Sequence, residues 1–296
     1  MPAILSATQL RLPPRLRDIS LTLRPGETTG LLGVNGAGKS SVLAALAGVL
    51  PLQAGEVQVH GQPLHAQPQL RRHIGWLPQR APLYDDMSVM ENLQFAAQLH
   101  KASPKTLGES LEQFELGDLR RRLARKLSGG ERMRLGLACC LIHQPDILLL
   151  DEPTAGLDPL QAQQLRQLIT SLAPQRAVLI ASHLLADIET LCQRALMLDR
   201  GLIVANEPLI LEHTLMLAQF SSPPDDASLL RVAGVERVHS RSGPQLVLQL
   251  SADAVAQMPE KLACQGWGLC LWKPLENPLL RHFQALGQAR ARDGSS

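Results

Sequence analysis

The sequence predicts an α/β fold in which a mostly parallel sheet alternates with helices, followed by a small C-terminal α+β domain. Continuous apolar runs at 147–150 and 177–181 are typical of strands buried on both faces, as in parallel sheets. Two segments with helical periodicity begin at about residues 129 and 159, and each of them follows a turn. A segment rich in Ser, Pro and Asp at 221–226 then separates a last region with its own strand and helix patterns.

The composition excludes several classes of protein. The chain has 296 residues, of which 45% are hydrophobic, enough for one large core and one smaller core. Its net charge of +2, with acids and bases interspersed, predicts no nucleic-acid partner. The five cysteines show no C-x-x-C spacing, which is typical of reduced thiols in the cytosol. No apolar run is long enough to span a bilayer, so a role at a membrane would need a partner protein.

Residues 33–41 fit the phosphate-binding pattern G-x-x-x-x-G-K-[ST]. In such a loop the glycines let successive backbone N–H groups point at phosphate oxygens, Lys39 reaches the outer phosphates, and the Ser40 hydroxyl ligates Mg²⁺. A short apolar run at 28–32 precedes the loop and a helical run at 41–47 follows it, which is the expected context. The sequence therefore predicts a P-loop nucleoside triphosphatase core. The predicted nucleotide-binding residues are Gly33, Val34, Asn35, Gly36, Ala37, Gly38, Lys39, Ser40, Ser41 and, from a later strand, Gln79.

Alternating apolar residues at 19–23 and 55–61 predict half-buried strands bounded by Gly turns, and hence an antiparallel β subdomain. A strand at 74–77 runs into Pro78 and places Gln79 at a strand end on the nucleotide side. From about 85 to 145 the period becomes helical, which predicts an inserted helical subdomain. Its basic run at 119–126 is interpreted as a solvated helix face rather than a binding site.

The segment Leu127-Ser128-Gly129-Gly130-Glu131 opens a helix in this subdomain. Ser128 and Glu131 have the S-x-x-E spacing of a capping box. Because a helix start with two glycines exposes backbone N–H groups, it is a second potential phosphate contact.

The apolar run at 147–150 delivers two carboxylates, Asp151 and Glu152, to the carboxyl end of a buried strand. Asp151 is expected to bind Mg²⁺, and Glu152 to orient or deprotonate the attacking water. The alternative, a pair of helix-capping acids, is less favoured because Pro153 follows and no helix starts there. Asp158 instead caps the next helix.

The strand at 177–181 delivers His183 to the same edge of the sheet. A lone histidine is usually structural, but this position beside the expected Mg²⁺ site favours a functional role. Segments at 196–198 and 202–204 predict a closing hairpin. A helix is expected after Glu207.

The predicted domains are a nucleotide-binding domain over 1–215 and an accessory α+β domain over 225–296. Strands are expected in the accessory domain at 235–239, 245–250 and 269–272, and helices at 252–264 and 276–291.

These motifs, in this order, resemble the ATP-binding cassette (ABC) transporter ATPases over residues 1–215. The resemblance implies that Leu127–Glu131 is the signature motif, that Asp151 ends the Walker B strand, and that Asp158 lies in the D-loop. It also implies catalytic roles for Lys39, Glu152 as base and His183 as switch histidine, and metal contacts for Ser40, Gln79 and Asp151. The implied cofactors are ATP and Mg²⁺.

The resemblance further implies a head-to-tail homodimer or ABC heterodimer in which Ser128, Gly129, Gly130 and Glu131 of one chain close on the γ-phosphate held by the other. The implied partner is a transmembrane permease subunit, which would hold the chain peripherally at the cytoplasmic face of the inner (plasma) membrane. The appended C-terminal region, including 275–283, is similar to that of bacterial exporters. A soluble ABC ATPase of translation or DNA repair is the alternative, less favoured because the chain shows neither a second cassette nor a long coiled coil.

The chain departs from the family pattern at one point. The family usually places an aromatic residue before the phosphate loop to stack on adenine, and here no aromatic precedes Trp76. The base is then expected to stack on an aliphatic side chain, on Arg11 or Arg15, or on no residue at all.

Overall fold

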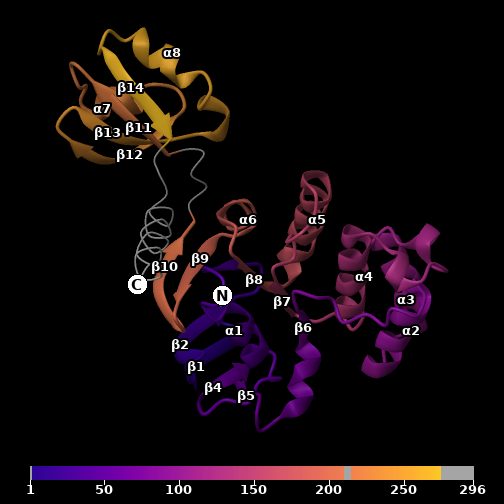
Figure 1. Ribbon diagram of the computed structural model, residues 1–296. Coiled ribbons are helices and arrows are strands. Elements are labelled where there is room, and N and C mark those ends of the chain that lie inside the picture. The colour runs from indigo at the N-terminus through magenta and orange to yellow at the C-terminus, as the bar shows by residue number, and fades with distance from the viewer. Residues whose placement is uncertain (1, 210–214, 275–296) are drawn as a thin grey trace, which may run out of the picture. The chain divides into compact units, whose positions relative to one another are not determined.

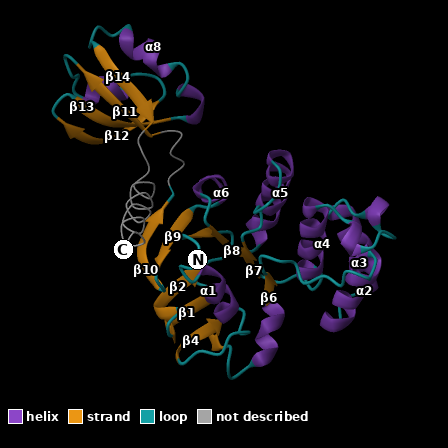
Figure 2. Ribbon diagram, in the orientation of Figure 1, coloured by secondary structure: helices purple, strands orange, loops and turns teal. Residues whose placement is uncertain are grey.

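The computed structural model of the chain describes residues 2–209 and 215–274. The chain divides into two compact units, Met1–Pro208 and Leu209–Ser296. Figure 1 labels their helices and strands, and Figure 2 shows the mixture of helices and strands in each unit. The predicted α/β fold is confirmed.

A ten-stranded sheet forms the first unit, in the order β5-β4-β1-β2-β10-β9-β3-β8-β7-β6. Strands β1, β2, β4 and β5 pair antiparallel, as predicted from their alternation, whereas β9, β3, β8, β7 and β6 are parallel. The bounds are β1 Leu5–Leu12, β2 Leu16–Leu23, β3 Thr28–Leu32, β4 Ala54–Val59, β5 Gln62–Pro63, β6 Ile74–Leu77, β7 Ile147–Asp151, β8 Ala177–Ser182, β9 Arg194–Asp199 and β10 Leu202–Pro208.

The parallel strands β3, β7 and β8 are buried along their whole lengths, which explains their unbroken apolar sequence. Because parallel strands all end at one edge, their carboxyl ends bring the P-loop, Asp151-Glu152 and His183 to the same edge of the sheet. Helix α1 (Lys39–Leu46) follows β3, α5 (Pro159–Leu172) connects β7 to β8, α6 (Leu185–Leu191) connects β8 to β9, and the 3₁₀ helix η1 (Pro68–His73) precedes β6.

The inserted helices α2 (Val89–His100), α3 (Pro104–Gln113) and α4 (Gly129–Leu141) gather in one group beyond β6 (Figure 1). The basic run is not one helix, because two short 3₁₀ helices, η2 (Gly117–Leu119) and η3 (Ala124–Lys126), flank a turn. Its arginines form ion pairs, Arg122 with Glu131 and Arg125 with Asp86. None of the helices within 2–209 and 215–274 combines the length and apolarity needed to cross a bilayer.

Over residues 215–274, the second unit is a four-stranded antiparallel sheet in the order β12-β13-β11-β14, with two short α-helices. Its elements are β11 Leu215–Phe220, α7 Asp226–Leu230, β12 Val235–Ser242, β13 Gln245–Leu250, α8 Met258–Ala263 and β14 Leu269–Pro274.

Strand β11 corrects the helix expected after Glu207. Met216, Ala218 and Phe220 alternate into the core of the second unit, and β11 pairs with β13 on one side and β14 on the other. The second unit therefore begins before the boundary predicted at 225. The helix predicted at 276–291 and the segment 275–283 lie outside the described residues.

Candidate nucleotide-binding site

The phosphate loop connects the buried strand β3 to helix α1, as its sequence predicts. Gly36 and Gly38 have φ values of 77° and 110°, the left-handed region that favours glycine. A Cβ on Gly33 would lie 2.6 Å from the carbonyl oxygen of Leu198, so a side chain there would push the loop off the neighbouring strand β9. The glycines are therefore needed for the loop conformation, which leaves the N-terminus of α1 facing the site.

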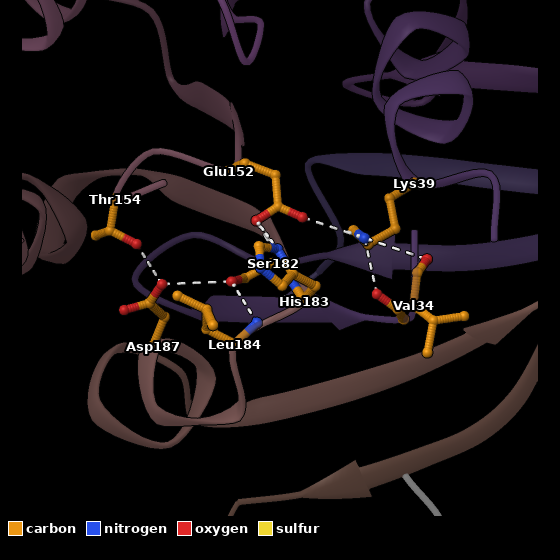
Figure 3. Close-up of polar contacts among 9 residues, drawn as sticks. Val34, Lys39, Glu152, Thr154, Ser182, His183, Leu184 and Asp187 are labelled. Atoms are coloured by element: carbon orange, nitrogen blue, oxygen red, sulfur yellow. Dashed lines mark hydrogen bonds and ion pairs between the residues drawn. The ribbon is translucent and has the colours of Figure 1, made fainter. Parts of the chain in front are cut away.

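Lys39 is held by three acceptors, the carbonyl oxygens of Gly33 and Val34 in the loop and the carboxylate of Glu152 beside it. Its Nζ donates a hydrogen bond to the Gly33 carbonyl oxygen at 2.7 Å and lies 3.1 Å from Glu152 Oε1 (Figure 3). Both side chains of this ion pair are 6% exposed. A phosphate that enters the loop would compete with Glu152 for the same ammonium group.

Glu152 also joins the ends of strands β7 and β8, where Asp151 pairs with Ala181. Its Oε2 lies 2.7 Å from His183 Nδ1 and accepts a hydrogen bond from the His183 backbone N–H at 3.3 Å. Glu152 has a φ of 50°, a left-handed conformation that costs about 1–2 kcal/mol for a residue with a side chain. The structure thus brings Lys39, Glu152 and His183 into one chain of contacts, in which the carboxylate lies in the middle.

Asp151 is 3% exposed, and its Oδ1 has no hydrogen-bond partner among the described residues. Burial raises the pKa of its carboxyl group, while the nearby Ser40 hydroxyl acts in the opposite direction. A buried carboxylate oxygen without a partner beside a hydroxyl is a donor set that fits Mg²⁺, which prefers oxygen ligands. The residues present therefore fit the predicted metal, with Ser40 and Asp151 as protein ligands.

A cavity of about 510 Å³ opens over the loop. Its lining includes the exposed side chain of Gln79, which follows β6, together with Glu152 from β7. The lining residues are Arg15, Asn35, Gly36, Gly38, Lys39, Ser40, Ser41, Gln79 and Glu152.

The signature segment forms a second cavity, away from the loop. Ser128 Oγ accepts a hydrogen bond from the Glu131 N–H at 3.2 Å, and Glu131 Oε2 accepts one from the Ser128 N–H at 2.7 Å, which confirms the predicted capping box. Ser128, Gly130 and Glu131 line a cavity of about 190 Å³ against α5, and no residue of the phosphate-loop cavity takes part in it. Gly129 lies against Leu157 instead.

Asp158 caps α5 as predicted, since its Oδ1 accepts a hydrogen bond from the Gln161 N–H at 2.9 Å. Within one chain, neither the signature segment nor Asp158 contributes to the cavity over the phosphate loop.

Sequence reasoning missed Asp187, which contacts the segment that follows β7 and the last residue of β8. Its side chain is fully buried on α6 and accepts hydrogen bonds from Thr154 and from Ser182 at 3.3 Å (Figure 3). The Arg166 guanidinium donates a further hydrogen bond to it at 2.9 Å. Thr154 and Ser182 lie beside Glu152 and His183 in the sequence, so Asp187 fixes both strand ends. No local motif marks this residue, because its three partners come from three different segments.

The cavity lining also shows which candidate can face the base. Among the described residues, no aromatic side chain lines the cavity, and Arg15, in the turn between β1 and β2, is the cationic side chain there besides Lys39. A guanidinium stacks on any base, at about 0.5–2 kcal/mol, without forming hydrogen bonds that distinguish adenine from guanine.

We therefore expect ATP and GTP to bind with similar affinity and Arg15→Ala to weaken the binding of both about equally. Titration with each nucleotide checks this, with Arg11→Ala as the control because Arg11 pairs with Asp18; a strong preference for ATP would contradict it.

Comparison with known proteins gives one consistent family. A family model described as "ABC transporter" matches residues 16–155. The probable multidrug ABC transporter ATP-binding protein YbhF of Escherichia coli (strain K12) is 37% identical over 208 residues, 68% of this chain and 36% of YbhF. The uncharacterized ABC transporter ATP-binding protein YhcH of Bacillus subtilis (strain 168) is 35% identical over 221 residues, 72% of each chain. The phosphonates import ATP-binding protein PhnC of Trichormus variabilis is 37% identical over 206 residues, 64% of this chain and 84% of PhnC.

A solved structure shows the same fold. CbiO1 from Clostridium perfringens, described as part of the ABC transporter complex cbiONQ, superposes with a TM-score of 0.63 at 25% identity and covers 71% of this chain and 90% of its own. This chain spans only about a third of the length of YbhF, so the activity, substrate and partners of that whole protein are not carried over by similarity alone.

Proposed function

Because this chain belongs to the family of ABC transporter ATPases, we propose that it binds ATP with Mg²⁺ over its phosphate loop and hydrolyses it to drive transport through a separate membrane subunit. The observation that carries the proposal is the convergence of Lys39, Gln79 and Glu152 on one cavity at the carboxyl edge of the parallel sheet. That edge is where open α/β sheets bind their ligands.

The phosphates are held by the loop. The backbone N–H groups of 33–41 and the N-terminus of α1 face the triphosphate, and Lys39 exchanges its contact with Glu152 for the outer phosphates. Ser40 and Asp151, with Gln79 at the mouth of the cavity, would hold Mg²⁺. When bound there, Mg²⁺ neutralises the charge that develops on the phosphate oxygens.

Glu152 then accepts the proton of the attacking water. Once Lys39 has moved to the phosphates, the carboxylate is left with His183, which holds it by two hydrogen bonds at the end of β8. His183 is 38% exposed and its Nδ1 lies 2.7 Å from Glu152 Oε2, so it is placed to orient the carboxylate. Histidine remains the rival candidate for the base.

Two chains complete one site in this proposal. Ser128 and Gly130 line a cavity separate from the phosphate loop of their own chain, so their exposed helix N-terminus is available to a γ-phosphate held by another chain. Nucleotide and partner chain should therefore stabilise each other by linkage.

Sedimentation of Glu152→Gln tests the shared site. We expect dimers with ATP and monomers with ADP or without nucleotide, because only the γ-phosphate reaches the signature helix of the other chain. The matched control is the double variant that also carries Ser128→Arg, which blocks that helix start and should abolish dimers without reducing ATP binding. If Glu152→Gln stays monomeric with ATP even when the membrane subunit is present, the two-chain mechanism is wrong for this chain.

The proposed direction of transport is export. The chain itself would lie at the cytoplasmic face of the plasma membrane. Support comes from the additional C-terminal unit and from the multidrug name of the relative YbhF. An import protein, PhnC, matches at the same identity, so a transport assay has to decide the direction. Co-purification with a multi-span membrane protein, followed by ATP-driven uptake into inside-out vesicles, tests both parts. Recovery of ribosomes or DNA-repair proteins instead would favour a soluble ABC ATPase.

A further inference from the structure

Two histidines and an aspartate from three separate elements meet at the edge of the sheet opposite to the phosphate loop. His60 lies in the turn between β4 and β5, His73 ends η1, and Asp146 precedes β7. We call these three residues the His60 cluster. None of them contributes to the nucleotide-binding cavity.

The register of the sheet explains why they meet. Strands β6 and β7 are parallel and their pairing starts at Ile74 and Ile147, so His73 and Asp146, one residue earlier on each strand, enter side by side. His60 has a φ of 52°, a left-handed turn conformation that redirects the chain between β4 and β5. Since Asp146 precedes Asp151 by the five residues of β7, the cluster is separated from Asp151 by about 17 Å at ~3.3 Å per residue.

The donor atoms are close together. Asp146 Oδ2 lies 2.8 Å from His73 Nδ1 and 3.1 Å from His60 Nε2, and all three atoms lie within 4.8 Å of one another. The two imidazole rings are 4.6 Å apart and inclined at 74°, so they approach the carboxylate from different directions. Ligands of a tetrahedral Zn²⁺ ion at about 2.0–2.2 Å are about 3.4 Å from one another, so an ion fits after shifts of about 1 Å or less.

We propose that the His60 cluster is a binding site for one borderline divalent transition-metal ion, of which Zn²⁺ is the expected one. Two imidazoles and one carboxylate suit Zn²⁺ and Co²⁺, whereas Mg²⁺ prefers oxygen ligands and is left to the nucleotide site. The side chains of His60 and Asp146 are 41% and 43% exposed, which gives the ion an entry path and leaves room for water as a fourth ligand. Because the cluster is partly exposed, the ion does not have to be buried in fully apolar surroundings, which would make binding costly.

The proton on His73 has to move when the ion binds. Arg72 Nε donates a hydrogen bond to His73 Nε2 at 3.3 Å, so Nδ1 carries the proton that it donates to Asp146. The ion would take the place of this proton on His73 Nδ1 and of the proton on His60 Nε2, which faces the same carboxylate. The other ring nitrogen of each histidine would take up a proton in turn, so both imidazoles stay neutral. Arg72 is exposed, so its guanidinium is free to exchange this hydrogen bond for one to water.

The bound ion would cross-link the two halves of the first unit. It would join the β4–β5 turn of the antiparallel strands to the start of β7 in the parallel core. We therefore assign it a structural role, and the proposal does not depend on the ATPase mechanism.

The test uses the untagged full chain, stripped with chelator and without nucleotide. Titration with Co²⁺ should give the visible absorption of a site with nitrogen and oxygen ligands at one ion per chain, and Zn²⁺ should displace it. His60→Gln, His73→Gln and Asp146→Asn should each weaken binding about tenfold or more. The matched control is His65→Gln, since His65 is 74% exposed, lies just beyond β5 and is outside the cluster.

Three results would overturn the proposal: no stoichiometric Co²⁺ absorption with the native chain, equal binding by the three cluster variants, or equal loss in the control. A thiolate-to-cobalt band would also overturn it, because it would place the ion on the exposed Cys264 or Cys270. ATP binding by each variant, measured separately, shows that the variant is folded.

Discussion

Glu152→Gln is expected to bind ATP as well as the native chain and to hydrolyse it about a hundredfold or more slowly. Glutamine keeps the shape of the side chain and an oxygen that accepts from His183, but it cannot accept the proton of water. It also loses the negative charge that lies 3.1 Å from Lys39 Nζ, so the ammonium is freer to move to phosphate. Affinity should therefore be unchanged or higher. Nucleotide titration and phosphate release, measured on the same preparation, check the two parts.

Lys39→Ala provides the contrast. It removes the ammonium group from the loop while Glu152 keeps its hydrogen bonds to His183, so binding itself should fail. If Glu152→Gln turns over ATP at nearly the native rate, Glu152 is not the base. His183→Ala would then be the variant that separates the remaining candidate from a positioning role.

Local rules predicted the parts of the site that lie within one segment. The phosphate loop, the capping box of Ser128 with Glu131 and the cap at Asp158 each depend on spacings of a few residues, and each has the expected local geometry. The buried strands β7 and β8 followed from their apolar runs. The contact of Lys39 with Glu152 and His183 could be expected in outline, because parallel strands end at one edge, but its geometry depends on the strand order.

The elements that were predicted wrongly or missed depend on contacts between segments that are far apart in the sequence. Strand β11 is six residues long, and a short apolar run does not distinguish a strand from a helix. What decides it is pairing with β13 and β14, which lie more than two dozen residues away in the sequence. Asp187 and the His60 cluster were missed because the residues that contact one another come from separate segments, so no spacing along the chain indicates them.

Asp187→Ala is expected to destabilise the first unit by about 3 kcal/mol or more, the cost of removing one partner from a buried ion pair. Asp187 is fully buried and neutralises Arg166, whose side chain is 25% exposed and lies 2.7 Å away. Without the carboxylate, the guanidinium loses its partner and the hydroxyls of Thr154 and Ser182 lose their acceptor. Asp187→Asn should cost less, because the amide oxygen still accepts hydrogen bonds, but it should not restore the native stability.

Calorimetry of the full chain measures this effect, provided that the transition of the first unit is identified as the one that ATP with Mg²⁺ raises. For a unit of this size the expected loss lowers that transition by about 6–12 °C. Glu112→Ala is the matched control, since Glu112 is an exposed acid on α3 and should change the transition little. The loss of Asp187 should also reduce hydrolysis below the new transition temperature, because the segments that hold Glu152 and His183 are no longer tied together. A variant that unfolds like the control and keeps its activity would show that the Thr154, Ser182 and Arg166 contacts do not hold these strand ends.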